Sequence, residues 1–387
     1  MKILKNSSWI LALWLIVVIW LVISATPGTG VGVLGEITEP ETITLVAAGD
    51  VIMHSPIVDS AYNPTDKSYN FQSIFSGIKD YLSQGDITVA VLETPLNAPG
   101  KGYSGYPQFN APGAIADAMK WSGIDLVFTA HNHSLDQGAA GVRSTMDYLD
   151  KIDLPQTGSR RSAVESGYKL VEVKDFKLAF FSVTTFTNGI PSPKGEEWLV
   201  NRLNFKSLAL DIQQAREAGA DAVILALHTG IEYERIPSTE QQQIVERLFD
   251  IGVDIVLGSH VHVIQPYELR TVFDQKSNTP SPRFVVYSLG NLLSNQRWRY
   301  SDCGLLLTFE LQKTQDKTGF TFKKITHQPI WVNRYLNGGR YQFNILKAEG
   351  PVYNGNDPAV DAAGKLRIGE VWRETEELIV NWNNRAR

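Results

Sequence analysis

The sequence predicts an α/β protein in which sheets and helices form layers. Short apolar runs recur along the chain, and several are apolar throughout, which is typical of strands buried on both faces. Amphipathic segments with apolar residues at three- and four-residue spacing lie between these runs. Such an alternation is typical of a layered α/β domain. The expected strands are Ile43–Ala48, Ile87–Leu92, Leu126–Thr129, Leu178–Val183, Ala222–Leu227, Ile255–Gly258, Phe284–Ser288 and Leu305–Leu311.

The helices are expected in the amphipathic segments between the strands. The clearest start signal is at Ser238, which has capping-box spacing to Gln241 and directly follows Pro237. The expected helices are Asn70–Gly85, Val142–Ile152, Phe205–Ala218 and Ser238–Ile251.

The last part of the chain has a different pattern. A strand-like run at Phe320–Ile325 precedes a stretch that we expect to be irregular, and a helical pattern follows from Ile368 to Trp382. We therefore predict a main domain at residues 42–312 and a C-terminal extension at 313–387 that packs on it. The aromatic residues of the irregular stretch are Trp331, Tyr335, Tyr341 and Phe343.

Composition excludes several classes of protein. Hydrophobic residues make up 43% of the 387 residues, which is enough for a core and argues against disorder. The net charge of −5 argues against a nucleic-acid partner, since no basic excess is available to neutralise phosphates. Cys303 is the single cysteine, so a disulfide within the chain and a thiolate zinc cluster are both excluded.

The N-terminal segment predicts export of the rest of the chain. Residues 9–25 carry no charge, whereas Lys2 and Lys5 precede them and no basic residue follows until Lys67. This asymmetry predicts a cytoplasmic tail at 1–8, a transmembrane anchor or signal segment at 9–25 and a linker at 26–41. The folded domain is then extracytoplasmic, held at the cell membrane by a single span, or secreted if the segment is cleaved.

Five polar clusters follow strand candidates, and six of the seven histidines lie in them. In α/β proteins the loops at the carboxyl ends of strands converge on ligands. The pair His260 and His262 is the strongest signal, because both rings of an H-x-H pair in an extended segment point the same way. The clusters are Gly49–His54, Leu92–Leu96, His131–Gly138, His228–Glu234 and Gly258–Gln265.

The donor types of these clusters predict a metal site. Imidazole, carboxylate and amide oxygen ligands suit zinc, manganese, iron or cobalt. Two acids, an Asn and several histidines exceed what one four-coordinate ion needs, and a pair of ions about 3.5–4 Å apart would use them. One bound ion remains the alternative.

Other polar residues have predicted supporting roles. Arg160 and Arg161 are candidates for binding an anionic substrate. Glu232 is expected to support His228 through an outer contact. Asp136 is expected either to orient His133 or to cap a helix.

The ordered motifs resemble the CapA (PgsA-type) family of poly-γ-glutamate capsule proteins. The resemblance covers roughly residues 42–310 and includes GD at Gly49, LET at Leu92, HNHSLDQG at His131, GSHVHVIQ at Gly258 and YSLGN at Tyr287. It implies membrane-associated synthesis or export of poly-γ-glutamate, with the folded domain facing outward. The implied partners are this polymer or another anionic substrate and other membrane proteins of a capsule synthesis complex.

This family is similar in turn to calcineurin-like metallophosphoesterases, which implies a four-layer α/β/β/α sandwich and a site for one or two divalent ions. The sequence departs from the superfamily pattern at two positions: three residues separate Asp50 from His54, and Glu stands at position 93 instead of Asp. The resemblance implies that Asp50, His54 and His262 bind one ion, that Asn132, His228 and His260 bind the other, that Glu93 bridges them and that His133 is the general acid.

Two other functions remain open from the sequence. A secreted metal-dependent phosphoesterase without a capsule role would have the same fold and ligands. A non-catalytic scaffold that binds polymer would retain the metal ligands but would not need His133.

Overall fold

The computed structural model describes residues 41–100, 102–274, 279–315 and 319–385. The predicted tail (1–8), the predicted anchor or signal segment (9–25) and all but the last residue of the predicted linker (26–41) lie outside these residues. Among the helices of the described ranges, none is both long and apolar enough to cross a membrane.

The first of two main sheets contains eight strands in the order β16-β15-β14-β1-β4-β5-β6, with β13 beside β1. On one side of β1, the strands β4, β5 and β6 run parallel to it, and so does β13. On the other side, β14, β15 and β16 join the sheet by antiparallel pairing. The strands are β1 (Thr42–Val51), β4 (Ile87–Leu92), β5 (Leu126–Phe128), β6 (Gln156–Thr157), β13 (Asn291–Leu293), β14 (Cys303–Lys313), β15 (Phe320–Asn337) and β16 (Arg340–Lys347).

The second sheet contains six strands in the order β11-β12-β10-β9-β8-β7. Its central strands are parallel, and an antiparallel strand lies at each edge. The strands are β7 (Tyr168–Val173), β8 (Phe176–Thr184), β9 (Ala222–His228), β10 (Ile255–Ser259), β11 (Tyr267–Asp274) and β12 (Thr279–Val286), and a separate hairpin joins β2 (Tyr62–Asn63) to β3 (Ser68–Tyr69).

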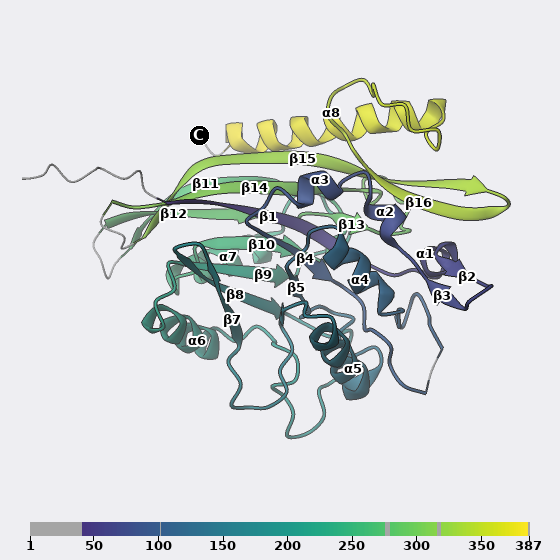
Figure 1. Cartoon of the computed structure of the whole chain (residues 1–387). Helices are drawn as coiled ribbons and strands as arrows, with labels where there is room; N and C mark the ends of the chain where they lie inside the picture. The colour runs from purple at the N-terminus through teal and green to yellow at the C-terminus, as the bar shows by residue number, and fades with distance from the viewer. Residues whose placement is uncertain (1–40, 101, 275–278, 316–318, 386–387) are drawn as a thin grey trace, which may run out of the picture. The chain divides into compact units, whose positions relative to one another are not determined.

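The two sheets pack face to face and helices cover their outer faces (Figure 1). The inner core joins Leu45 of β1 to Phe180 of β8, so one hydrophobic layer serves both sheets. α4 and α5 cover the first sheet, and α6 and α7 cover the second. The helices are α1 (Ser55–Ser60), α2 (Gln72–Phe75), α3 (Lys79–Leu82), α4 (Ala114–Trp121), α5 (Gly138–Lys151), α6 (Phe205–Glu217), α7 (Thr239–Asp250) and α8 (Ala362–Arg385).

The α/β prediction is confirmed, and each of the eight expected strands overlaps a strand of the structure. The capping box of Ser238 and Gln241 is present at the start of α7. The single helix expected at Asn70–Gly85 is wrong, because two short helices, α2 and α3, take its place. Gly77 lies between them, and a Cβ there would come within 2.5 Å of the Ile345 carbonyl oxygen, so the chain passes close to β16 at this point.

The stretch expected to be irregular is a long hairpin. β15 and β16 pair in regular antiparallel register up to Asn337 and Arg340. Gly338 and Gly339 between them have φ of 58° and 79°, which is the geometry of a tight two-residue hairpin turn. The hairpin extends the first sheet, and the boundary predicted at residue 312 falls inside β14.

α8 covers the part of the first sheet that the hairpin adds. Its residues Ile368 and Val371 join the inner core together with Trp331 of β15. Figure 1 shows α8, in yellow, lying along β15. The C-terminal residues therefore share the core between the sheets.

Candidate metal centre

Polar residues from both sheets meet at the carboxyl ends of the parallel strands. Asp50 lies near the end of β1, Glu93 directly follows β4, and His228 is the last residue of β9. His260 and His262 follow β10, and the His260 backbone N–H donates to Asp50 Oδ2 at 3.2 Å. This bond joins the second sheet to the first.

The backbone of the β10 loop is strained at both histidines. His260 has φ of 92° and His262 has φ of 61°, which are unusual values for residues with a side chain. Strain of this kind persists where the surrounding structure imposes it, and it is common at functional sites.

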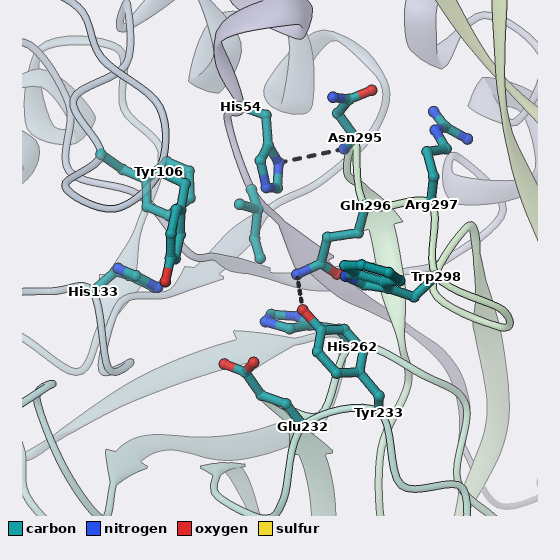
Figure 2. Close-up of a pocket in the computed structure, with 12 residues that line it drawn as sticks. His54, Tyr106, His133, Glu232, Tyr233, His262, Asn295, Gln296, Arg297 and Trp298 are labelled. Carbon is teal, nitrogen blue, oxygen red and sulfur yellow. Dashed lines mark hydrogen bonds between the residues drawn. The ribbon is translucent and has the colours of Figure 1, made fainter.

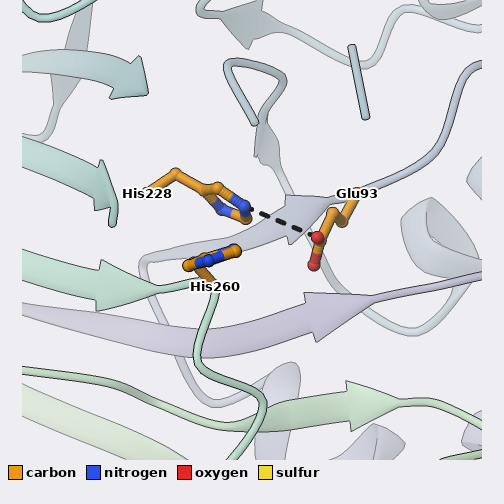
Figure 3. A group of neighbouring side chains, drawn as sticks. All are labelled: Glu93, His228 and His260. Carbon is orange, nitrogen blue, oxygen red and sulfur yellow. Dashed lines mark ion pairs between the residues drawn. The ribbon is translucent and has the colours of Figure 1, made fainter. Parts of the chain in front are cut away.

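The first ligand group contains Glu93, His228 and His260, all buried, with potential ligand atoms within 4.8 Å of one another (Figure 3). His228 Nε2 lies 3.5 Å from Glu93 Oε1 and 2.9 Å from Asn132 Oδ1. The other ring nitrogen, Nδ1, is hydrogen-bonded to Ser259 Oγ at 2.9 Å. This contact fixes the ring so that Nε2 faces the group, as outer hydrogen bonds commonly do for metal-binding histidines.

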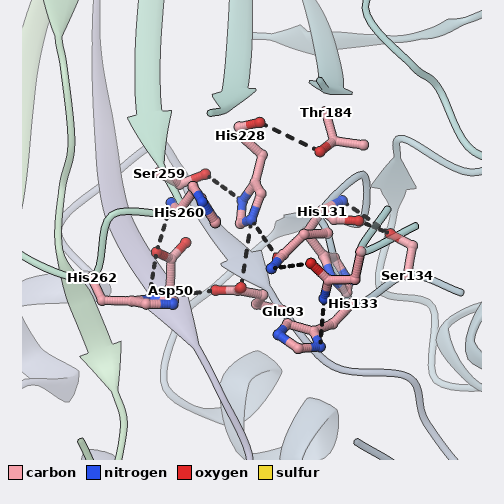
Figure 4. Close-up of polar contacts among 12 residues, drawn as sticks. Asp50, Glu93, His131, His133, Ser134, Thr184, His228, Ser259, His260 and His262 are labelled. Atoms are coloured by element: carbon pink, nitrogen blue, oxygen red, sulfur yellow. Dashed lines mark hydrogen bonds and ion pairs between the residues drawn. The ribbon is translucent and has the colours of Figure 1, made fainter. Parts of the chain in front are cut away.

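The second ligand group contains Asp50, Glu93 and His262, which are also buried. His262 Nδ1 lies 3.7 Å from Asp50 Oδ2 and 3.9 Å from Glu93 Oε2 (Figure 4). Glu93 therefore belongs to both groups: Oε1 faces His228 and Oε2 faces His262.

The electrostatics of the two groups fit bound cations. Among the described residues, Asp50 Oδ1, both oxygens of Glu93 and His260 Nδ1 are buried without a hydrogen-bond partner. Burial raises the pKa of the Asp50 and Glu93 carboxyls well above their usual range, with mutual repulsion adding to the effect on Asp50. Charged carboxylates with three partnerless oxygens at this depth are costly, and nearby divalent ions would stabilise them.

The imidazoles are also in the state that binds metals. Burial lowers the pKa of His228, His260 and His262 well below the usual range, so these rings are neutral. Neutral imidazole together with carboxylate and amide oxygen is a donor set for zinc, manganese or iron. The residues present thus fit divalent metal ions.

His133 and Asp136 form a hydrogen-bonded pair beside the two groups. His133 Nδ1 lies 2.8 Å from Asp136 Oδ2, and the same oxygen accepts the Phe109 backbone N–H at 2.8 Å. Burial lowers the pKa of His133, but the Asp136 hydrogen bond and nearby carboxylates outweigh it and raise the pKa above 6.5. Of the two roles expected for Asp136, the geometry favours orientation of His133, because the cap residue of α5 is Gln137.

His133 and His262 line a cavity of about 560 Å³ (Figure 2). Exposed aromatic residues border it: Tyr106 is 77% exposed and Trp298 is 67% exposed. The cavity therefore gives access from the surface to the second ligand group and to His133.

The comparisons with known proteins identify the family. The model of the family described as bacterial capsule synthesis protein PGA_cap matches residues 44–296. This chain belongs to that family. The match confirms the resemblance to capsule proteins of the CapA type, and it spans both ligand groups.

Two relatives of this chain carry CapA names. The capsule biosynthesis protein CapA of Bacillus anthracis is 25% identical over 283 residues, which cover 71% of this chain and 65% of that protein. The PGA biosynthesis protein CapA of Bacillus subtilis (strain 168) is 28% identical over 205 residues, covering 50% and 49%. The chain thus spans less than two thirds of the length of either relative.

Two solved structures, a phosphoesterase and a nucleotidase, are similar to this chain at low sequence identity. The calcineurin-like phosphoesterase YfkN from Bacillus subtilis has a TM-score of 0.44 and 14% identity, covering 76% of this chain and 91% of that chain. The NAD nucleotidase NadN of Haemophilus influenzae has a TM-score of 0.44 and 11% identity, covering 79% and 54%.

The structure does not bring His54 into either ligand group. His54 lies on the cavity wall, where the Asn295 backbone N–H donates to its Nδ1 at 3.4 Å and Phe109 contacts the ring edge-on. The chain turns into α1 directly after His54, which is the cap residue of that helix. The three residues after Asp50 therefore carry His54 away from the groups.

Arg160 and Arg161, the candidates for binding an anionic substrate, lie apart from the ligand groups. Both line a separate cavity of about 460 Å³. Arg161 is paired with Asp147 at 2.7 Å and with Asp150 at 2.5 Å. These ion pairs occupy its guanidinium.

The predicted support of His228 by Glu232 has no counterpart in the contacts described for His228. Glu232 is exposed and lines the main cavity, whereas Ser259 holds the His228 ring. The sequence sign of this contact is the position of Ser259 directly before the H-x-H pair, at the end of β10.

Arg297 is a cavity residue that sequence reasoning missed. Its Nη1 donates to the Val332 carbonyl at 2.8 Å, while Nε and Nη2 are buried without a hydrogen-bond partner in the described structure. Burial and the nearby Arg334 lower its pKa to about 10, so it remains positively charged at neutral pH. No sequence pattern indicates a role for Arg297. The one sign in the sequence is that it lies six residues after Asn291 of the YSLGN motif.

Proposed function

We propose that this chain acts in poly-γ-glutamate capsule biosynthesis or export through a site that binds two divalent ions. The observation that carries the proposal is Glu93, whose two buried oxygens face different ligand groups. A carboxylate in this position can bridge two ions. Membership of the PGA_cap family supports the role in the capsule.

The ligands proposed for the two ions come from separate segments of the chain. Asp50 and His262 would hold one ion, His228, His260 and Asn132 the other, and Glu93 both. Bound divalent ions supply positive charge that stabilises phosphoryl oxygens and lowers the pKa of water. Manganese, zinc and iron match these donors.

The chain's own residues can orient a substrate and move a proton at this site. His133 Nδ1 is held by Asp136, which leaves Nε2 as the ring nitrogen available to donate a proton to a leaving oxygen. Arg297 offers a charged guanidinium at the cavity and would contact an anionic group such as a carboxylate or phosphate.

We place the folded domain outside the cytoplasm, anchored by residues 9–25. The uncharged run and the preceding Lys2 and Lys5 support this orientation. Poly-γ-glutamate and membrane proteins of a capsule synthesis complex are the proposed partners. The packing of helices on both outer sheet faces supports the four-layer α/β/β/α arrangement.

Gene replacement in a polymer-producing host tests this function. Glu93→Ala should abolish or strongly reduce surface poly-γ-glutamate, because it removes a ligand common to both groups. Arg160→Met, which changes the separate cavity, is the matched control and should leave the polymer unchanged. A normal capsule in the Glu93→Ala strain, with the variant present at wild-type level, would contradict the proposal.

A metal-dependent phosphoesterase without a capsule role is the second candidate. The His133–Asp136 pair favours it, because a proton donor beside a metal site is what ester hydrolysis uses. Turnover of a generic phosphoester by the manganese-loaded chain, together with a normal capsule in the deletion strain, would support this candidate.

Polymer loss in the Glu93→Ala strain, together with normal polymer in the His133→Ala strain, would support a non-catalytic scaffold.

A further inference from the structure

Asn291 lies beside the second ligand group, although neither composition nor motif spacing assigned it a role. It is fully buried and is the first residue of β13. Its register partner in the parallel pair of β1 and β13 is Asp50. Register partners on neighbouring strands project from the same face of a sheet, so both side chains belong to the face that carries the site.

The amide of Asn291 is held in one orientation. Its Nδ2 lies within hydrogen-bond distance of the His262 carbonyl at 3.2 Å, Gln296 Oε1 at 3.0 Å and the Ser301 carbonyl at 2.8 Å. All three partners are acceptors, so the nitrogen end is identified by its contacts. The oxygen, Oδ1, consequently points at His262 Nδ1, 3.2 Å away.

The same arrangement recurs in the first ligand group. Asn132 Nδ2 donates to Asn188 Oδ1 at 3.2 Å, and Asn132 Oδ1 lies 2.9 Å from His228 Nε2. In each group, one oxygen of Glu93 faces a histidine, and the side-chain oxygen of an asparagine is turned toward that same histidine.

We propose that Asn291 Oδ1 is a ligand of the ion held by Asp50, Glu93 and His262. It takes the place that the family resemblance gives to His54, which lies on the cavity wall with Nδ1 facing the Asn295 backbone N–H. This inference rests on the proposed metal site. In the competing account, Asn291 only accepts a hydrogen bond from His262 and orients its ring.

Metal binding to the full chain tests whether Asn291 contributes to the site, and the metal-loaded structure then separates the two accounts. Bound manganese and zinc are measured by equilibrium dialysis and elemental analysis, with two ions per chain expected for the wild type. Asn291→Leu removes the oxygen and should weaken one of the two ions by tenfold or more, since even outer contacts typically contribute 10- to 100-fold. Asn291→Asp keeps an oxygen and should retain both ions.

Two further variants show whether the loss is specific. His54→Ala should still bind two ions. Asn333→Leu removes another buried amide of the same sheet, whose Nδ2 donates to the Ala359 carbonyl at 3.0 Å, and should also bind two. Thermal unfolding in EDTA checks that the Asn291→Leu variant is folded without metal. If it is unfolded, the metal content of Asn291→Asp and the structure of the metal-loaded wild type test the inference instead.

A crystal structure of the manganese- or zinc-loaded chain gives the direct measurement. We expect Asn291 Oδ1 at ligand distance, about 2.0–2.2 Å from the ion for zinc. An ion bound by His54 instead, with Asn291 Oδ1 still paired only to His262 Nδ1, would overturn the inference and leave the proposed function standing. A wild-type chain that binds no ion would overturn both.

Discussion

At the scale of single residues, Glu93 is distinctive because its two oxygens belong to different environments. Oε1 faces His228 from the second sheet, and Oε2 faces His262 from the loop after β10. Burial together with the charge of Glu232 raises the pKa of Glu93 when no cation is present. Metal binding therefore has to displace protons, and its affinity falls with decreasing pH.

The first prediction concerns His133. If the site hydrolyses phosphoesters, His133→Ala should lower turnover of a generic phosphoester by about 10²–10⁴-fold with metal content unchanged. Asp136→Asn removes the carboxylate that raises the pKa of His133, so the protonated ring is lost at lower pH. The alkaline limb of the pH–rate profile should then move to lower pH; an unmoved limb would exclude His133 as the acid.

The second prediction concerns Arg297. Arg297→Met should weaken binding of a poly-γ-glutamate oligomer by about tenfold or more, because a hydrogen bond to a charged group contributes about 1.5–3 kcal/mol. Fluorescence titration of the full chain measures this. Arg160→Met removes the same charge from the other cavity and should bind the oligomer as the wild type does. The reverse order of effects would place the anion site around Arg160.

Part of the site could be predicted from the sequence because its residues follow recognisable strands. The clusters that contain Asp50, Glu93, His228 and the H-x-H pair come directly after apolar runs. Because the carboxyl ends of parallel strands lie at the same edge of a sheet, these residues could be expected to meet. His54 differs because the direction of the chain after Asp50 depends on the start of α1. The position of Arg297 depends on its contact with Val332 of β15, and no local pattern shows where β15 lies in the first sheet.

At the scale of elements, the β15–β16 hairpin extends the first sheet and helix α8 packs on this extension. Asp302 joins them: Arg367 of α8 donates to Asp302 Oδ1 at 2.8 Å, and the Trp331 indole N–H of β15 donates to Oδ2 at 2.9 Å. Arg367 also pairs with Glu374 at 2.9 Å. These contacts tie α8 to the sheet through a largely buried carboxylate.

The third prediction concerns this carboxylate. Burial alone would raise the pKa of Asp302, but the hydrogen bonds and charge of Arg367 and the Trp331 N–H lower it below 3.8. Its contribution to stability is therefore present above about pH 4 and is lost as the pH falls through the lower folded-state pKa.

Asp302→Asn should reduce the free energy of unfolding by about 1.5–3 kcal/mol at pH 7. Denaturant unfolding at several pH values measures the difference from the wild type, which should shrink below about pH 4. A difference that stays constant down to about pH 2 would show that Asp302 carries no charge-dependent stability.

The elements that the sequence did not predict are those that depend on distant partners. The β15–β16 hairpin has a Gly-Gly turn signal at Gly338, but its aromatic residues do not alternate cleanly with polar ones. Its strands form because β14 offers a pairing edge. Helix α4 was not expected either, and it packs on the first sheet through Ile115 and Met119.

At the scale of the whole molecule, the site exists only where the two sheets meet. The first sheet supplies Asp50, Glu93 and Asn132, and the second supplies His228 and the loop after β10. The sheets share one apolar core, so their strand ends are fixed relative to each other. Each ion bound between them should stabilise the folded chain by about 2.7 kcal/mol when free metal is at 100 times the Kd of its site.

The most direct test of the account is the number of divalent ions bound by the full chain and by Glu93→Ala. Equilibrium dialysis against manganese or zinc, followed by elemental analysis, should give two ions per wild-type chain and a large loss of both in the variant. Melting temperature should rise with metal in the wild type and stay nearly constant in the variant. A wild type without bound metal, or a Glu93→Ala chain that keeps both ions, would contradict the central claim.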